Sequence, residues 1–146
     1  MNYIFDTNIL LGFIREHSSV IIFRDTYRPF SNGNTAILSI VSVGEIKSIA
    51  LRNNWGKNKW KQLHELMSLF VIADIDAADV VDMYAEIDTF SYGKLKDKPL
   101  STSARKMGKN DLWIAATATI TNAMLVTTDQ DFLHLDGIYF DIINTK

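Results

Sequence analysis

The sequence predicts an α/β fold in which helices cover both faces of a central, mainly parallel sheet of about four to five strands. Two observations lead to this prediction. Short apolar runs alternate along the chain with longer segments of helical periodicity. The 146 residues, 47% of them hydrophobic and 22% charged, are typical of a globular chain with a buried core. We therefore expect one domain over residues 1–146.

The first predicted unit is a strand followed directly by a helix. Tyr3–Phe5 is a short apolar run, and Ile9–Ile14 continues as an apolar helix with Asn8 or Thr7 available as its N-cap. After the turn-forming "SNGN", the run Thr35–Ser39 predicts a second strand.

The middle of the chain predicts three helices and one strand. Apolar residues from Val41 onward recur at helical spacing until "RNNWG" provides a stop. A further helix is expected from about Lys59 to Leu69, and it leads into a strand at Phe70–Ala73. Residues 76–90 then form an amphipathic helix whose acidic side chains spread over an exposed face.

The last third begins with a polar, lysine-bearing connection. A helix is expected at Asp111–Thr121, a strand at Met124–Thr127 and a final strand at Ile138–Phe140. The uncharged stretch Leu112–Thr128 just reaches the length of a membrane span, but it contains several threonines and ends in β-type residues. We interpret it as a buried helix followed by a strand, and we expect no contact with a membrane.

Four acidic residues stand where a parallel sheet places its ligand site. Asp6 follows the first strand, Asp129 follows the "MLVTT" strand, and Asp111 lies in the first turn of a helix. Glu45 interrupts the largely apolar helix after the second strand, where a charge is costly. Since ligands of such sheets bind beyond the carboxyl ends of the strands, all four are expected to converge there.

Convergent carboxylates repel one another unless they take up protons or a cation neutralises them. Mg²⁺ fits best, with Mn²⁺ as a substitute, because both favour carboxylate and water ligands. Cysteine is absent, and the histidines show no ligand spacing, so zinc is not expected. These histidines are His17, His64 and His134.

Such an ion activates water and stabilises the oxygens of an in-line displacement at phosphorus. Asp6, Asp111 and Asp129 would coordinate it directly or through water, and Glu45 would coordinate it or orient the attacking water. Thr127 and Asn8 are candidates for holding these carboxylates in place.

Four segments resemble a known family in order and spacing. "FDTNILL", "SVGEI", "NDLWIAATA" and "LVTTDQDF" are similar to the four acidic motifs of PIN-domain ribonucleases, most closely the VapC-type toxins. The resemblance covers nearly the whole chain. It places Asp6, Glu45, Asp111 and Asp129 on the acidic quartet of the family, and Asp131 on a fifth position that some members use.

The resemblance implies a metal-dependent endoribonuclease with a compact α/β/α fold. It also implies a homodimer and a small antitoxin, encoded beside the toxin, that makes the enzyme inactive. No basic leader precedes the first apolar residues, and the absence of cysteine permits a reducing compartment, so we expect a cytoplasmic protein. RNA is the expected substrate.

Structural and non-enzymatic alternatives also fit individual residues. Asp6 alone suits a helix N-cap, Asp111 suits the positive end of its helix, and Asp129 with Asp131 suits a turn. A phosphatase with a D-x-D pattern fits poorly because Asn8 occupies the second position. A binding module that has kept the fold and lost cleavage stays open, although none of the four acids is missing.

Two basic segments are possible contacts for RNA, and each has a structural alternative. "RNNWGKNKWK" mixes four basic residues with Trp55 and Trp60, whose rings can stack on bases or pack inward. The connection before Asp111 is either an RNA contact or a surface loop. Its basic residues are Lys94, Lys96, Lys98, Arg105, Lys106 and Lys109. Apolar residues 20–23 fit a dimer or antitoxin groove, or core packing.

Overall fold

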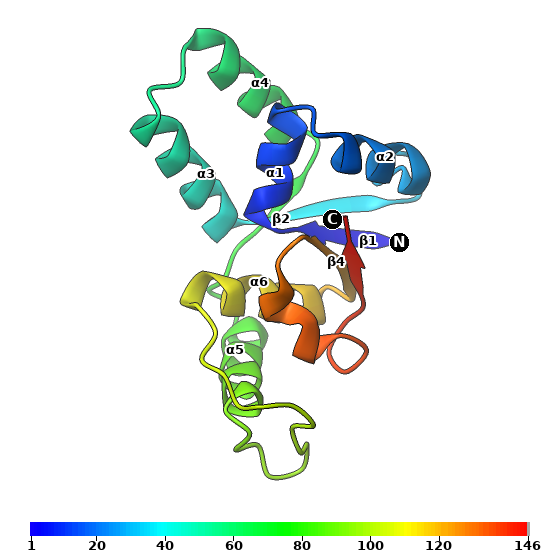
Figure 1. Cartoon of the computed structure of the whole chain (residues 1–146), viewed down its shortest axis with the longest axis vertical. Coiled ribbons are helices and arrows are strands. Elements are labelled where there is room, and N and C mark those ends of the chain that lie inside the picture. Colours follow the sequence, from blue (N-terminus) through cyan, green and yellow to red (C-terminus); the bar gives the residue numbers. More distant parts are fainter. Residues whose placement is uncertain (146) are drawn as a thin grey trace.

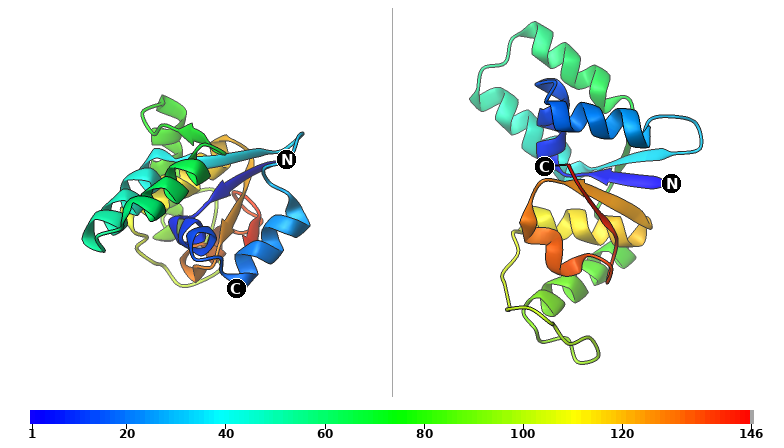
Figure 2. Two further views of the ribbon diagram at one scale, coloured as in Figure 1. Left: turned by 90° about the horizontal axis from the view of Figure 1, so that it is seen from above. Right: turned by 45° about the vertical axis from the view of Figure 1, so that its right-hand side comes forward.

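The computed structural model describes residues 1–145, and these form three layers. A central sheet lies between two groups of helices, one on each face (Figures 1 and 2). The predicted α/β/α class is therefore confirmed. The alternation of strand and helix forces this arrangement, because parallel strands need crossover connections that cover the sheet faces.

The sheet has five strands, and every pair of neighbours is parallel. The strands are β1 (Asn2–Phe5), β2 (Thr35–Ser39), β3 (Val71–Ala73), β4 (Ala123–Thr127) and β5 (Ile142–Asn144). Their order is β3-β2-β1-β4-β5, so the chain builds outward from β1 in one direction and then in the other. The order in which strands are added to the sheet reverses between β1 and β4, and open α/β sheets bind ligands at such a reversal.

The first four helices pack on one face of the sheet. They are α1 (Thr7–Ile14), α2 (Ser18–Tyr27), α3 (Ile40–Arg52) and α4 (Lys57–Met67). Phe5 and Leu38 point from the sheet into this layer and pack against Ile9, Phe23 and Leu63. All five side chains are almost fully buried, so this core fixes α1 against the end of β1.

The other face is covered by α5 (Ala78–Ser91), α6 (Lys109–Ile120) and the 3-10 helix η1 (Gln130–Leu135). Ile4 and Leu125 of the sheet pack there against Ile87, Ile114 and Phe132. The uncharged stretch is thus the buried helix α6 followed by β4, as expected. Within residues 1–145, no helix combines the length and apolarity that crossing a membrane requires.

The local structure differs from the predictions in three places. Helix α2 was not predicted, because its mixture of polar and apolar residues gives only a weak helical pattern. The last strand is β5, at Ile142–Asn144, whereas residues 137–139 form a turn, which Gly137 begins with φ +73° and an isolated β-bridge between Asp136 and Phe140 closes. The N-cap of α1 is Asp6 and neither Thr7 nor Asn8.

The two basic segments have defined structural roles. Trp55 and Trp60 are half-buried and pack against the core that lies under α1–α4. In the connection after α5, the ammonium group of Lys98 lies 3.3 Å from a Glu86 carboxylate oxygen and 4.4 Å from the ring centre of Tyr139. The backbone N–H of Arg105 donates to the Ser91 carbonyl at 2.8 Å. Much of this connection is therefore held against α5.

Candidate functional site

The predicted acidic residues lie at the carboxyl edge of the sheet. Asp6 directly follows β1 and caps α1, and Asp129 follows β4 and caps η1. Asp111 is in the first turn of α6, and Glu45 lies in the second turn of α3. Strands β1 and β4 are neighbours, so the switch in strand order brings these four elements together.

Asp6 is buried and is held by its neighbours. One carboxylate oxygen accepts the backbone N–H of Thr7 at 2.8 Å, and the other accepts the hydroxyl of Thr127 at 2.8 Å. Burial nevertheless raises its pKa, and the charges of Asp129 and Glu45 raise it further, while the two hydrogen bonds act in the opposite direction. The site therefore destabilises the negative charge that it holds.

Glu45 is joined to the same site by Thr7, whose hydroxyl donates to a Glu45 carboxylate oxygen at 2.8 Å. Thr7 thus contacts both Asp6, through its backbone, and Glu45, through its side chain. Thr127 holds a carboxylate as predicted. The prediction for Asn8 was wrong, because its side chain is exposed and the contact comes from Thr7.

Three aspartates form the tightest group at the site. One carboxylate oxygen from each of Asp111, Asp129 and Asp131 lies within 4.8 Å of the others. The backbone N–H of Asp131 also donates to Asp129 at 2.9 Å, so the turn before η1 fixes their relative position. Both the predicted fifth position and two members of the predicted quartet are in this group.

The other four acids all affect the pKa of the Asp111 carboxyl group. Burial and then the charges of Asp6, Asp129, Glu45 and Asp131 raise its pKa to about 7. Five acidic side chains therefore share one electrostatic site, and the four predicted residues are not dispersed over the surface.

No basic side chain within residues 1–145 forms an ion pair with any of these five acids. The uncompensated charge calls for a cation, and the donor atoms are hard carboxylate and hydroxyl oxygens, which suit Mg²⁺ or Mn²⁺. The residues present thus fit a divalent ion, whose closest ligands would come from Asp111, Asp129 and Asp131.

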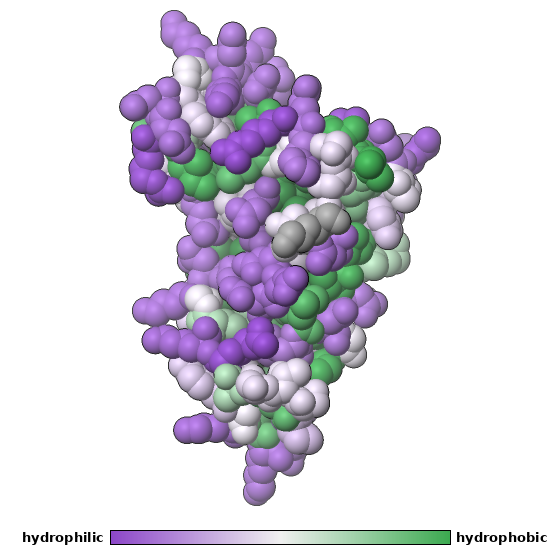
Figure 3. Space-filling view, in the orientation of Figure 1, coloured by the Kyte–Doolittle hydropathy of each residue, from purple (hydrophilic) through white to green (hydrophobic). Residues whose placement is uncertain are grey.

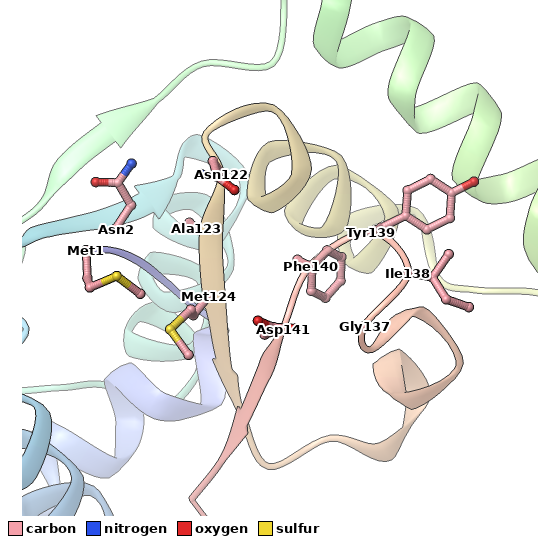
Figure 4. A pocket seen from close by; sticks show the side chains of 10 residues that line it. All are labelled: Met1, Asn2, Asn122, Ala123, Met124, Gly137, Ile138, Tyr139, Phe140 and Asp141. Atoms are coloured by element: carbon pink, nitrogen blue, oxygen red, sulfur yellow. The ribbon is translucent and has the colours of Figure 1, made fainter.

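Two hollows adjoin the acids, and another lies away from them. One runs beside Glu45 between α3 and the start of α6, and the other runs beside Asn8 and Thr128 between α1 and α2. A cavity of about 500 Å³ lies at the amino ends of β1 and β4, where Asn2, Met124 and Tyr139 line it (Figure 4). The acids follow the opposite ends of the same strands, so this last cavity is not part of the site.

The fold and the site together define a class: a three-layer α/β/α protein that gathers carboxylates where its strand order reverses. The chain belongs to the PIN-domain family, because the family model described as "PIN domain" matches residues 3–138. It is also similar to Ribonuclease VapC2 of Rickettsia felis, with 29% identity over 142 residues, which are 97% of each chain. The resemblance inferred from the sequence motifs is thus confirmed.

Solved structures show the same fold. The structure of VapBC2 from Rickettsia felis, bound to a DNA fragment from its promoter, superposes with a TM-score of 0.78 at 24% identity and covers 99% of this chain and 98% of that one. VapBC-1 from nontypeable Haemophilus influenzae superposes with a TM-score of 0.74 at 20% identity, again over 99% and 98% of the two chains.

Thr7 is the site residue that sequence reasoning missed. The local sequence predicts only a helix-cap role for Thr7, although its place directly after Asp6 indicates that it lies beside the acids. Its contact with Glu45 spans 38 positions of the chain. The sequence pattern alone does not reveal that pairing, because it depends on how α3 packs beside α1.

Proposed function

We propose that the protein is a Mg²⁺- or Mn²⁺-dependent endoribonuclease and the toxin of a toxin–antitoxin pair, acting through one PIN domain over residues 1–146. The observation that carries this proposal is the set of five acids at the strand switch, with the pKa of Asp111 raised to about 7 and no basic ion-pair partner within residues 1–145. Such a site is suited to a divalent ion and a phosphodiester.

The side chains have distinct roles in this proposal. Asp111, Asp129 and Asp131 would hold the ion, with Asp6 and Glu45 completing its surroundings directly or through water. A bound ion supplies activated water and stabilises the charge that develops at phosphorus. Thr127 and Thr7 keep the carboxylates of Asp6 and Glu45 in fixed orientations. Glu45, at the mouth of a groove, is placed to orient the attacking water.

The similar proteins support the proposed partners. The curated relative is a ribonuclease by name, which favours RNA as the substrate. One solved neighbour, from Klebsiella pneumoniae, is a toxin–antitoxin complex, with a TM-score of 0.68, 19% identity and cover of 99% of this chain and 98% of that chain. We propose a cognate antitoxin and a homodimer, in the cytoplasm. Exposed apolar side chains on α2 (Ile22) and on the edge strand β3 (Val71) offer surfaces for such contacts.

The cleavage test uses the purified chain, a structured RNA and Mn²⁺. We expect cleavage by the wild type, loss of cleavage with Asp6→Asn, and full cleavage with Asp82→Asn. Asp82 is an exposed acid of α5 outside the site, so it controls for the loss of one negative charge. Cleavage by the Asp6 variant would count against the mechanism. A wild-type chain that does not cleave the RNA would count against it as well.

The toxin role has a separate test. Expression of the chain alone should arrest bacterial growth, whereas the Asp111→Asn variant should permit it. Co-expression of the small protein encoded beside the gene should restore growth of the wild type. Equal growth with both forms, together with retained RNA binding, would instead favour a catalytically silent PIN-fold module that binds RNA or protein.

A further inference from the structure

A groove leads away from the acidic site along α3. It encloses about 530 Å³, and its walls include Glu45, Ser48 and Arg52 of α3 and Asn110 at the start of α6. Figure 1 shows α3 and the first turn of α6 on the same side of the molecule, and hydrophilic side chains cover much of that side in Figure 3. Because Glu45 belongs to both, the groove and the acidic site are continuous.

The spacing of the residues on α3 aligns them along the groove. Positions 45, 48 and 52 fall on one face of a helix, and Ser48 lies about 4.5 Å along the axis from Glu45. The guanidinium Nη1 of Arg52 donates to the Ser48 hydroxyl at 2.7 Å. This contact turns the guanidinium back along the helix, toward the acids, and holds it over the groove.

Arg52 keeps further N–H groups in this position that can donate hydrogen bonds to a ligand. A guanidinium carries five N–H groups, and within residues 1–145 Arg52 forms no ion pair with a carboxylate. Asn110 on the facing wall is exposed and offers an amide that both donates and accepts. A phosphate fits these groups, because its oxygens accept from a guanidinium in a fork-like, bidentate geometry.

The charges around the site favour this direction for a phosphodiester chain. The end of α3 and the start of α4 carry Arg52, Lys57, Lys59 and Lys61, whereas α5, which packs on the other side of α6, carries an acidic series. A polyanion is attracted toward the basic surface, whereas the acids of α5 are offset by the basic connection that is held against that helix.

We propose that the α3 groove is a phosphate subsite for the RNA strand, in which Arg52, positioned by Ser48, binds a phosphate next to the one that is cleaved, and Asn110 closes the other wall. This inference rests on the proposed function, since it takes RNA as the ligand. Arg52 is then a substrate-positioning residue. The acids act on the phosphate that is cleaved, and the guanidinium binds a neighbouring phosphate of the same strand.

The test measures binding of a fluorescent single-stranded RNA by anisotropy. The proteins compared are the full chain with Asp129→Asn, to prevent cleavage, and the same chain with Arg52→Gln or Lys47→Gln added. Lys47 is an exposed cation of α3 that does not line the groove, so it controls for the change in charge. We expect about a tenfold loss of affinity with Arg52→Gln, as for one charge-assisted contact, and little change with Lys47→Gln.

The salt dependence adds a second readout. Arg52→Gln should reduce the slope of log affinity against log salt concentration by about 0.7, as expected for one contact to a single strand, and Arg52→Lys should restore it. Equal affinities for the Arg52 and Lys47 variants would overturn the subsite. It would also be overturned if light scattering showed that Arg52→Gln changes the oligomeric mass and that this change accounts for the lost binding. Cleavage by the unmutated chain is measured separately. A chain that binds RNA through Arg52 and never cleaves it would contradict the proposed function and not the subsite.

Discussion

The hydroxyl of Thr127, at the end of β4, donates a hydrogen bond of 2.8 Å to the carboxylate of Asp6, at the end of β1. The same oxygen accepts the backbone N–H of Asp129 at 2.9 Å. One buried side chain therefore fixes two acids that follow neighbouring strands. The relative position of Asp6 and Asp129 therefore depends directly on how β1 and β4 are paired in the sheet.

We predict that Thr127→Val weakens metal binding by about 10- to 100-fold, as expected when a partner of a metal-binding carboxylate is lost. Valine keeps the shape of threonine but cannot donate to Asp6 or accept from Asp129. The buried N–H and carboxylate left without this partner should also lower the free energy of unfolding by about 1–3 kcal/mol. Isothermal titration with Mn²⁺ and urea unfolding measure the two effects.

Thr119→Val is the matched control for this prediction. The Thr119 hydroxyl donates to the carbonyl of Ala115 in its own helix, so its removal does not touch the acids. Metal affinity should be unchanged in this variant. A similar loss of affinity in both variants would show that Thr127 acts through general stability and has no specific role at Asp6.

The sequence predicted the layers and the acids because both leave local signals. Buried parallel strands appear as short apolar runs, and a charge such as Glu45 within an apolar helix has few structural explanations. The position of β5 was missed because Ile138 and Phe140 are as apolar as a strand residue, yet Gly137 at positive φ starts a turn there. The Thr7–Glu45 contact and the Arg52 groove depend on helix packing, which no local pattern encodes.

Without metal, the stability that Asp111 contributes should decline as the pH rises from about 4 to 7. The pKa of Asp111 is raised to about 7 from an ordinary value of 3.8, so the folded state binds the proton more tightly than the unfolded chain. The stabilisation is complete below pH 3.8 and is lost as the pH rises through 7. Urea unfolding in EDTA over this range measures the trend for the wild type and for Asp111→Asn.

The variant supplies the control, because an amide at position 111 does not titrate. Its stability in EDTA should exceed that of the wild type above pH 7, where the charge repulsion is removed, and the difference should shrink at lower pH. Excess Mg²⁺ should stabilise the wild type more than the variant, since ions bind the folded state. A variant less stable than the wild type at pH 8 in EDTA would argue against repulsion at Asp111.

Two glycines in helices should respond oppositely to alanine. A Cβ at Gly12 in α1 would lie 2.6 Å from the Cγ2 of buried Val20 in α2, whereas one at Gly44 in α3 meets open space. Gly12→Ala should therefore cost about 1–3 kcal/mol through overpacking, and Gly44→Ala should stabilise by about 0.5–1 kcal/mol. Urea unfolding compares the two, and adding Val20→Ala to Gly12→Ala should relieve part of the cost. Additive losses in that double variant would contradict a clash between α1 and α2.

His134 should make stability fall at acid pH. Its ring nitrogen Nε2 lies 2.7 Å from the Ser91 hydroxyl in a buried contact between η1 and the end of α5. Burial, and then the charge of Arg105, lowers its pKa to about 4 from an ordinary value of 6.5. Below pH 6.5 the unfolded chain takes up a proton that the folded state refuses, so this contribution to stability is lost as the pH falls toward 4.

The comparison that isolates this effect is His134→Gln against His64→Gln, an exposed histidine of α4. Above pH 7 the His134 variant should be less stable by about 1–3 kcal/mol, since the buried hydrogen bond between the ring and the Ser91 hydroxyl is lost. Between pH 6.5 and 4 only proteins that keep His134 lose this contribution, so the gap in stability between the wild type and the His134 variant should narrow as the pH falls. The His64 variant controls for the removal of a histidine side chain. Taking differences at each pH removes the opposite trend of Asp111, which all three proteins share. A difference in stability that stays constant down to pH 4 would mean that folding does not lower the pKa of His134. The ring would then take up its proton at the same pH in the folded and the unfolded chain.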